Sequence, residues 1–249
     1  MTIQSLWVGD ALTPMERLSL SSFVAHGHNV DLFVYDDVAN VPDGVTLRDA
    51  AEVLLRSAIF RYADSGSLAG FSNSFRYKLL LERGGWWVDT DVVCVQPFDF
   101  DSEHVFASEL SHGAPVVTSC VIRAPAGSPA VEQAWQTCAA SDPATLVWGQ
   151  TGPNLCAEVV RAHGLESFVQ PPAVFCPIPF YEWRTLIDPS AEVAIPAESR
   201  AVHLWNEMWR RGGVDKSAAF DRDCLYERLK TAPCPPSSTA ALLITTNNR

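Results

Sequence analysis

Two aspartates one residue apart interrupt an apolar stretch, and their type and spacing suit the binding of a metal ion. The stretch "ERGGWWVDTDVVCVQPF" covers residues 82–98 and carries Asp89 and Asp91. On a strand these two side chains would point to the same face and converge, with Thr90 turned away. Neighbouring carboxylates repel unless a positive charge separates them, and oxygen ligands suit Mg²⁺ or Mn²⁺. The pattern therefore predicts a divalent cation with open positions for substrate phosphates; the alternative is a solvated strand end.

A helix predicted just before the pair adds a positive charge. The segment "FSNSFRYKLLLERGG" (Phe71–Gly85) has a helical pattern that ends at two glycines. Asn73 and Arg76 are three residues apart and share one face of this helix, near its N-terminal end. Arg76 can neutralise a phosphate, and Asn73 can hydrogen-bond to a sugar or ribose hydroxyl. A second role for Arg76, pairing with Asp89, is compatible with the first.

The remaining elements predict the frame that positions these residues. "IQSLWV" and "VDLFVYDD" are predicted strands around a helix that begins with Thr13, Pro14 and Glu16, a capping-box pattern. Strand, helix and strand in this order predict a parallel pair. The expected fold is α/β, with a Rossmann-like, mostly parallel central sheet flanked by helices. Further elements are expected as helices over residues 47–55 and 214–230 and as a strand over residues 201–205.

We expect one domain over residues 1–231 and a flexible C-terminal tail over residues 232–249, where Pro and Ser cluster. The 249 residues are 47% hydrophobic and 19% charged, which indicates a globular chain. The net charge of −11 and the absence of a basic run argue against a nucleic-acid partner.

Cysteine usage and the N-terminus predict a cytoplasmic protein. The seven cysteines are widely spaced, are odd in number and form no C-x-x-C pair, so they are expected to be buried, reduced thiols. No signal peptide and no membrane-spanning stretch are predicted, and peripheral contact with a membrane is left open.

Together these residues resemble a known family. The block "FSNSFRYKLLLERGGWWVDTDVV" is similar to the sugar-transfer region of nucleotide-sugar glycosyltransferases of the GT-A type, which carry a D-x-D motif. The parallels are the Golgi galactosyl- and mannosyltransferases and the glucosylating domains of large bacterial toxins. The segments "LWVGDALTP", "WGQTGPNL" and "AVHLWNEMW" extend the resemblance from Leu6 to Trp209.

The resemblance implies a single GT-A-like domain and a retaining hexosyltransferase of glycan or polysaccharide synthesis. It implies a nucleotide-diphosphate-sugar donor, a UDP-sugar in preference to a GDP-sugar, and a glycan or other hydroxyl acceptor. The metal would be Mn²⁺ or Mg²⁺. No carboxylate stands out as a nucleophile, so the donor's own leaving phosphate would act as the base.

The resemblance also implies roles for individual residues. Catalysis falls to Asp89, Asp91 and Arg76, and metal binding falls to Asp91, Asp89 and His203. Donor binding falls to a larger set, in which Trp7 stacks on the base: Trp7, Asn73, Arg76, Trp87, Asp89, Trp205 and Asn206. Asn73 stands where relatives often have Asp, and Trp87 stands where they often have Tyr.

The segment "HLWNEMWRRGG" (His203–Gly213) predicts a mobile lid over the donor. Trp205 would cover the diphosphate and donate to it from its indole N–H, while Arg210 or Arg211 would add positive charge. The alternative is a final strand that packs its Trp into the core.

Two other functions compete with sugar transfer. "DTDVV" also resembles the D-x-D-x-[TV] start of Mg²⁺-dependent haloacid-dehalogenase-type phosphatases, in which the first Asp is the nucleophile. That family also needs a later Lys and a later acidic pair; Lys216 is the one Lys between Lys78 and Lys230, and no clear acidic pair follows. The third function is a non-catalytic carbohydrate-binding protein, which would display some of the eight Trp on its surface.

Overall fold

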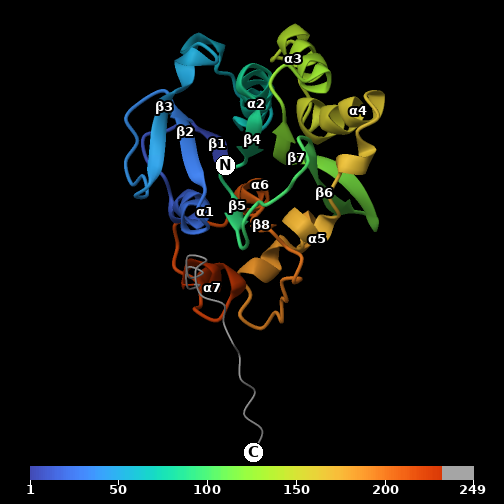
Figure 1. Ribbon diagram of the computed structural model, residues 1–249. Coiled ribbons are helices and arrows are strands. Elements are labelled where there is room, and N and C mark those ends of the chain that lie inside the picture. The colour runs from blue at the N-terminus through green and yellow to red at the C-terminus, as the bar shows by residue number, and fades with distance from the viewer. Residues whose placement is uncertain (232–249) are drawn as a thin grey trace, which may run out of the picture.

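The computed structural model describes residues 1–231 as an α/β fold around a six-stranded sheet (Figure 1). The strand order is β3-β2-β1-β4-β7-β6, in which the first four strands are parallel and the last two are antiparallel to their neighbours. The strands of this sheet are β1 (Thr2–Trp7), β2 (Asn29–Val34), β3 (Val45–Asp49), β4 (Gly85–Val88), β6 (Val105–Ser111) and β7 (Ala114–Ala124). A second, two-stranded antiparallel sheet pairs β5 (Val92–Cys94) with β8 (Ala201–His203). The predicted fold class, mostly parallel and flanked by helices, is therefore confirmed.

Helices cover both faces of the central sheet. One hydrophobic cluster joins the sheet to α1 and to the C-terminal elements, and the other joins it to α2, α3 and α4 (Figure 1). Successive residues of a strand point to opposite faces of the sheet, so the two tryptophans of β4 pack in different clusters. Trp86 lies in the first cluster and Trp87 in the second. The helices are α1 (Pro14–Ala25), α2 (Ala69–Arg83), α3 (Pro129–Ala140), α4 (Leu155–Ala162), α5 (Pro172–Phe175), α6 (Asn206–Arg211) and α7 (Leu225–Thr231).

Two glycines make the sharp turn from α2 into β4. Gly84 ends the helix with φ +63°, and Gly85 follows with φ +88°, both in the left-handed region that favours glycine. A Cβ on Gly84 would lie 2.4 Å from the backbone nitrogen of Ala126. Only glycine fits there, and the turn therefore fixes where β4 delivers the residues that follow it.

The aspartate pair does not lie on one strand, as the sequence predicted. β4 ends at Val88 and β5 begins at Val92, in the other sheet, so Asp89 and Asp91 occupy the link between the sheets. The backbone of Asp89 anchors this link: its N–H donates to the carbonyl of Cys120 at 2.9 Å, and its carbonyl accepts from Val92 at 3.1 Å. The two side chains still reach one site, through a turn rather than through strand alternation.

Two predicted helices differ from the structure. Residues 47–55 are predicted to be helical, but residues 47–49 are the last three residues of β3. Pairing with β2 holds them extended, although helix-forming residues follow. The closing helix begins at Leu225 rather than at residue 214. The segment before it is held in turns, in which the carboxylates of Asp215 and Asp221 accept the N–H groups of Ser217 and Asp223.

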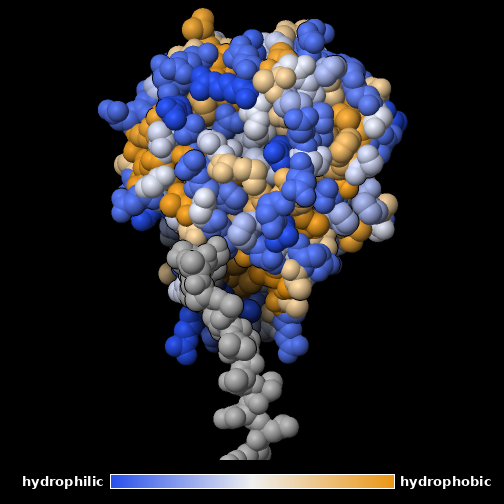
Figure 2. Space-filling model, viewed as in Figure 1, coloured by the Kyte–Doolittle hydropathy of each residue, from blue (hydrophilic) through white to orange (hydrophobic). Residues whose placement is uncertain are grey.

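Other predictions concern the thiols, the tail and the surface. Six cysteines in residues 1–231 are free and buried, as predicted. Cys234 and the predicted tail, residues 232–249, lie outside the described residues. Within residues 1–231, no helix has the length and apolar character needed to cross a membrane. Figure 2 shows hydrophilic residues over much of one face, with hydrophobic residues scattered among them.

We predict that acid weakens the fold through His28. This imidazole is buried, and its Nε2 accepts the backbone N–H of Phe98 at 3.1 Å, which requires the neutral ring. Burial, aided by the nearby N-terminal charge and His26, lowers the pKa of His28 from 6.5 to about 4. Between these values the unfolded chain binds the extra proton, so the free energy of unfolding falls as the pH falls through this window.

The expected loss is about 1–3 kcal/mol between neutral pH and pH 4, measured by urea unfolding at several pH values. His28→Gln keeps an acceptor for Phe98 without titrating, so its unfolding free energy should depend less on pH. Equal pH dependence in the two proteins would show that His28 is not responsible.

Candidate active site

A cavity of about 670 Å³ opens where β1 and β4 end. Ligand sites in α/β sheets form at the carboxyl ends of parallel strands, so this is the expected position. Every residue predicted for metal, donor or catalysis lines this cavity: Trp7, Asn73, Arg76, Trp87, Asp89, Asp91, His203, Trp205 and Asn206. Residues more than 190 positions apart in the chain thus line the same cavity.

Asp89 is held by two donors from the elements that flank it. Its Oδ1 accepts from the guanidinium of Arg76 at 2.7 Å and from the indole N–H of Trp87 at 2.8 Å. Arg76 is 3% exposed and also donates to the carbonyl of Ser119 at 2.6 Å. Burial raises the pKa of Asp89, Arg76 opposes the rise, and Asp91 adds to it. Arg76 therefore supplies the positive charge that stabilises this partly buried carboxylate.

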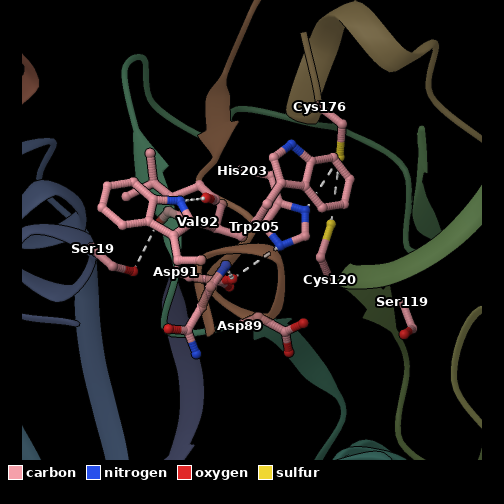
Figure 3. Close-up of polar contacts among 12 residues, drawn as sticks. Ser19, Asp89, Asp91, Val92, Ser119, Cys120, Cys176, His203 and Trp205 are labelled. Carbon is pink, nitrogen blue, oxygen red and sulfur yellow. Dashed lines mark hydrogen bonds and ion pairs between the residues drawn. The ribbon is translucent and has the colours of Figure 1, made fainter. Parts of the chain in front are cut away.

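Asp91 is held from the C-terminal elements instead. Its Oδ2 accepts the backbone N–H of Asn206 at 2.8 Å, at the start of α6, and lies 3.3 Å from Nε2 of His203 (Figure 3). Burial alone would raise the pKa of Asp91, but the charge and hydrogen bond of His203 lower it. Burial disfavours the charged imidazole, yet Asp91 and its other partners raise the pKa of His203 well above its usual value. Without a cation the two groups form an ion pair.

Asp89, Asp91 and His203, which we call the carboxylate cluster, have the chemistry of a hard-cation site. One ligand atom from each lies within 4.8 Å of the others. Two carboxylate oxygens and one imidazole nitrogen suit Mn²⁺ or Mg²⁺, with positions left for phosphate oxygens. The residues therefore fit the predicted metal, which would displace the proton of His203 and take its place beside Asp91.

Trp7 and Asn73 lie in different environments. Trp7 ends β1 and is partly exposed to the cavity, with the ammonium of Lys216 5.5 Å from its ring centroid. Its buried Nε1 has no hydrogen-bond partner among residues 1–231. Asn73 is buried, and its Nδ2 donates to Oγ1 of Thr151 at 3.3 Å. The Trp7 ring is thus partly open to the cavity, while the amide of Asn73 holds the segment that precedes α4.

The segment predicted as a lid packs into the core. Trp205 and Trp209 are 7% and 1% exposed, and both belong to the hydrophobic cluster that contains β5 and β8. The indole N–H of Trp205 donates to the carbonyl of Ile178 at 2.8 Å, so in this structure it is not directed at the cavity, and its predicted donation to a diphosphate stays a prediction. Arg210 and Arg211 both bond to Glu207. The alternative from the sequence, a closing element with its tryptophans in the core, describes the observed packing.

The structure adds a carboxylate that the sequence did not single out. Glu109 and Thr118, from neighbouring strands β6 and β7, line the same cavity. Burial raises the pKa of Glu109, although His203 and Thr118 oppose the rise. A Glu in the strand pattern "VFASELS" carries no signal of function, because only the pairing of β6 with β7 shows which residues face the cavity.

A family comparison supports the resemblance found in the sequence. Residues 144–241 match the sequence model of a family described as "Alpha 1,4-glycosyltransferase conserved region". The match contains the loop before α4 and the segment with His203, Trp205 and Asn206. The resemblance to glycosyltransferases is therefore confirmed, and the block with Asp89 and Asp91 lies outside the matched residues.

Solved structures of glycosyltransferases show weaker similarity. The PaToxG glycosyltransferase is 14% identical over 67% of this chain and 71% of that one, with a TM-score of 0.49. The ligand-free glycosyltransferase domain of the YGT toxin is 9% identical over 70% of this chain and 80% of that one, with a TM-score of 0.47. Both TM-scores lie below 0.5.

Proposed function

We propose that this protein is a metal-dependent glycosyltransferase that moves a sugar from a nucleotide-diphosphate donor to a hydroxyl acceptor. The observation that carries the proposal is the meeting of Asp89, Asp91 and His203 in one cavity, in a chain whose C-terminal part matches a glycosyltransferase family. A divalent cation held by this cluster would neutralise the charge that develops on the leaving diphosphate.

The order of the sheet suggests how a donor lies in the cavity. Trp7 comes from β1, the aspartates follow the neighbouring β4, and Glu109 comes from the far side, on β6. With the diphosphate at the carboxylate cluster, the base lies toward Trp7 and the sugar lies toward Glu109 and Thr118. The carboxyl group of Glu109, whose pKa is raised by burial, can then accept a hydrogen bond from a hydroxyl of the sugar or of the acceptor.

Several finer features belong to the same proposal. We assign the donor to UDP-sugars in preference to GDP-sugars, the acceptor to a glycan or another hydroxyl compound, and the metal to Mn²⁺ or Mg²⁺. Retention of configuration follows the resemblance and is checked by NMR of the anomeric linkage in the product. A reducing compartment such as the cytoplasm suits the six buried free thiols.

The two competing functions find less support in the site. A phosphatase would need a free nucleophilic carboxylate at Asp89, whereas Oδ1 of that residue is held by Arg76 and Trp87. A carbohydrate-binding surface would need displayed tryptophans, whereas five are at most 7% exposed: Trp86, Trp87, Trp183, Trp205 and Trp209.

One assay with two sets of substrates separates the three functions. Purified protein with Mn²⁺ is given a panel of nucleotide sugars and, separately, phosphoesters. Release of free nucleoside diphosphate supports the transferase. Release of inorganic phosphate from the phosphoesters would mean a phosphatase, and release of neither would mean a binding protein, so each of these results contradicts the proposal.

We predict that Trp7→Ala weakens binding of the nucleoside diphosphate by about 1–3 kcal/mol, the range typical of base stacking. Trp7→Phe keeps an aromatic face and should lose less. Both are measured by calorimetric titration with Mn²⁺ present, after circular dichroism has shown an intact fold. Unchanged affinity in a folded Trp7→Ala protein would remove Trp7 from the donor site.

A further inference from the structure

A second cluster lies on the other side of His203. The Sγ atoms of Cys120 and Cys176 are 3.7 Å apart, and Sγ of Cys176 is 3.9 Å from Nδ1 of His203 (Figure 3). All three side chains are buried, and one ligand atom from each lies within 4.8 Å of the others. We call Cys120, Cys176 and His203 the thiol cluster.

His203 belongs to both clusters through different nitrogens. Its Nε2 faces Asp91 at 3.3 Å, and its Nδ1 faces the thiols. Cys120 lies on β7, Cys176 directly follows α5, and His203 ends β8, so three separate elements bring the ligand atoms together. Such a set is held by the core and does not depend on a mobile loop.

We propose that the thiol cluster is a binding site for a thiophilic divalent cation of the zinc class. Two thiolates and one imidazole form a known type of zinc site with a fourth position left open. A histidine that binds a metal through one nitrogen commonly donates its other N–H to a carboxylate, and Asp91 stands in that place. Binding would release the two thiol protons and the Nδ1 proton of His203 to solvent, and the Nε2 proton would stay directed at Asp91.

The distances fit a metal site better than a disulfide. With bonds of about 2.3 Å and tetrahedral angles, two zinc-bound sulfurs lie roughly 3.8 Å apart, against the observed 3.7 Å. The corresponding sulfur-to-nitrogen separation is roughly 3.6 Å, against the observed 3.9 Å. A disulfide would need the sulfurs to approach to about 2.05 Å.

The two clusters would select different cations. Oxygen ligands in the carboxylate cluster favour hard Mn²⁺ or Mg²⁺, and sulfur ligands in the thiol cluster favour soft cations. Both clusters use the imidazole of His203. When a soft cation binds Nδ1, the remaining proton stays on Nε2 and points at Asp91. Nε2 then has no free lone pair with which to bind the hard cation. The thiol cluster is therefore placed to inhibit the use of a hard cation, a consequence that rests on the proposed function, whereas soft-cation binding itself does not.

The test uses Cd²⁺ as the probe and needs no activity assay. Reduced, chelator-free protein is titrated with Cd²⁺ while ultraviolet absorbance reports thiolate-to-metal charge transfer and calorimetry reports stoichiometry. We compare the wild type with Cys176→Ala and with Cys138→Ala, a matched control whose buried thiol lies on α3 in the other hydrophobic cluster. Circular dichroism verifies that each variant is folded.

The wild type and Cys138→Ala should bind one Cd²⁺ per chain with a charge-transfer band. Loss of a group that only orients a ligand costs about 10–100-fold in metal affinity, so loss of a direct ligand in Cys176→Ala should cost at least about 100-fold. No band in the wild type, or the same band and affinity in Cys176→Ala, would overturn the proposal. Cys176→Ala is chosen over a substitution of Cys120, because Cys120 lies on β7 in the central sheet and its loss could prevent folding. Cys176 follows a short helix outside that sheet.

Discussion

Asp91→Asn is expected to lower turnover by about two orders of magnitude or more, because the cation that stabilises the leaving diphosphate would lose a charged ligand. A hundredfold loss corresponds to about 2.7 kcal/mol of transition-state stabilisation. The measurement is the turnover number at saturating donor and Mn²⁺. Asp223→Asn, which changes an acid with a 75% exposed side chain, serves as the control and should keep full activity.

The fold of Asp91→Asn should survive with a modest loss of stability. Neighbouring carboxylates repel, but in the structure His203 and the N–H of Asn206 stabilise the charge of Asp91 and lower its pKa. The Asn side chain keeps an acceptor for Asn206 and loses the ion pair with His203. A folded Asp91→Asn protein with more than a tenth of wild-type turnover would remove Asp91 from the metal site.

The second large effect is expected on stability. Arg76→Met should lower the free energy of unfolding by about 3 kcal/mol, the lower end of the usual cost of removing one partner of a buried ion pair, because Arg76 is buried but the side chain of Asp89 is 26% exposed. Asp89 would then lie beside Asp91, in a partly buried position, without the charge of Arg76. The loss should shrink at acidic pH, because protonation of Asp89 removes the unpaired charge.

A double variant separates the pairing role of Arg76 from a general packing defect. Arg76→Met with Asp89→Asn leaves no unpaired charge, so it should regain part of the lost stability while remaining inactive. Urea unfolding of the wild type, both single variants and the double variant gives the coupling energy. Wild-type stability in Arg76→Met, or no recovery in the double variant, would show that the ion pair does not hold this part of the fold.

The local signals in the sequence predicted the elements beside the site well. The helix ended by Gly84 and Gly85 is present as α2, and the capping box of Thr13 and Glu16 opens α1. Both depend on backbone chemistry within a few residues, which a sequence displays directly. The pairing of Arg76 with Asp89, left open as a second role, is observed because α2 and β4 are joined by a tight turn.

Features that depend on distant pairing could not be predicted in the same way. The strand alternation assumed for Asp89 and Asp91 fails because β5 leaves the central sheet to pair with β8. Cys176 meets His203 only after the C-terminal half of the chain has folded back against β7. The pairing of β5 with β8 and the contact of Cys176 with His203 both join distant segments. Neither produces a periodic or local sequence pattern, so neither can be predicted from one segment alone.

The central claim is that the carboxylate cluster uses a divalent cation to hold a nucleoside diphosphate, and calorimetric titration of the wild type with UDP tests it most directly. GDP is titrated in parallel, and each titration is run with Mn²⁺ and with EDTA. We predict that a nucleoside diphosphate, UDP in preference to GDP, binds with Mn²⁺ at least about tenfold more tightly than with EDTA, a difference of about 1.4 kcal/mol. The account would be contradicted if UDP and GDP each bound as tightly with EDTA as with Mn²⁺. It would also be contradicted if neither nucleotide bound under either condition.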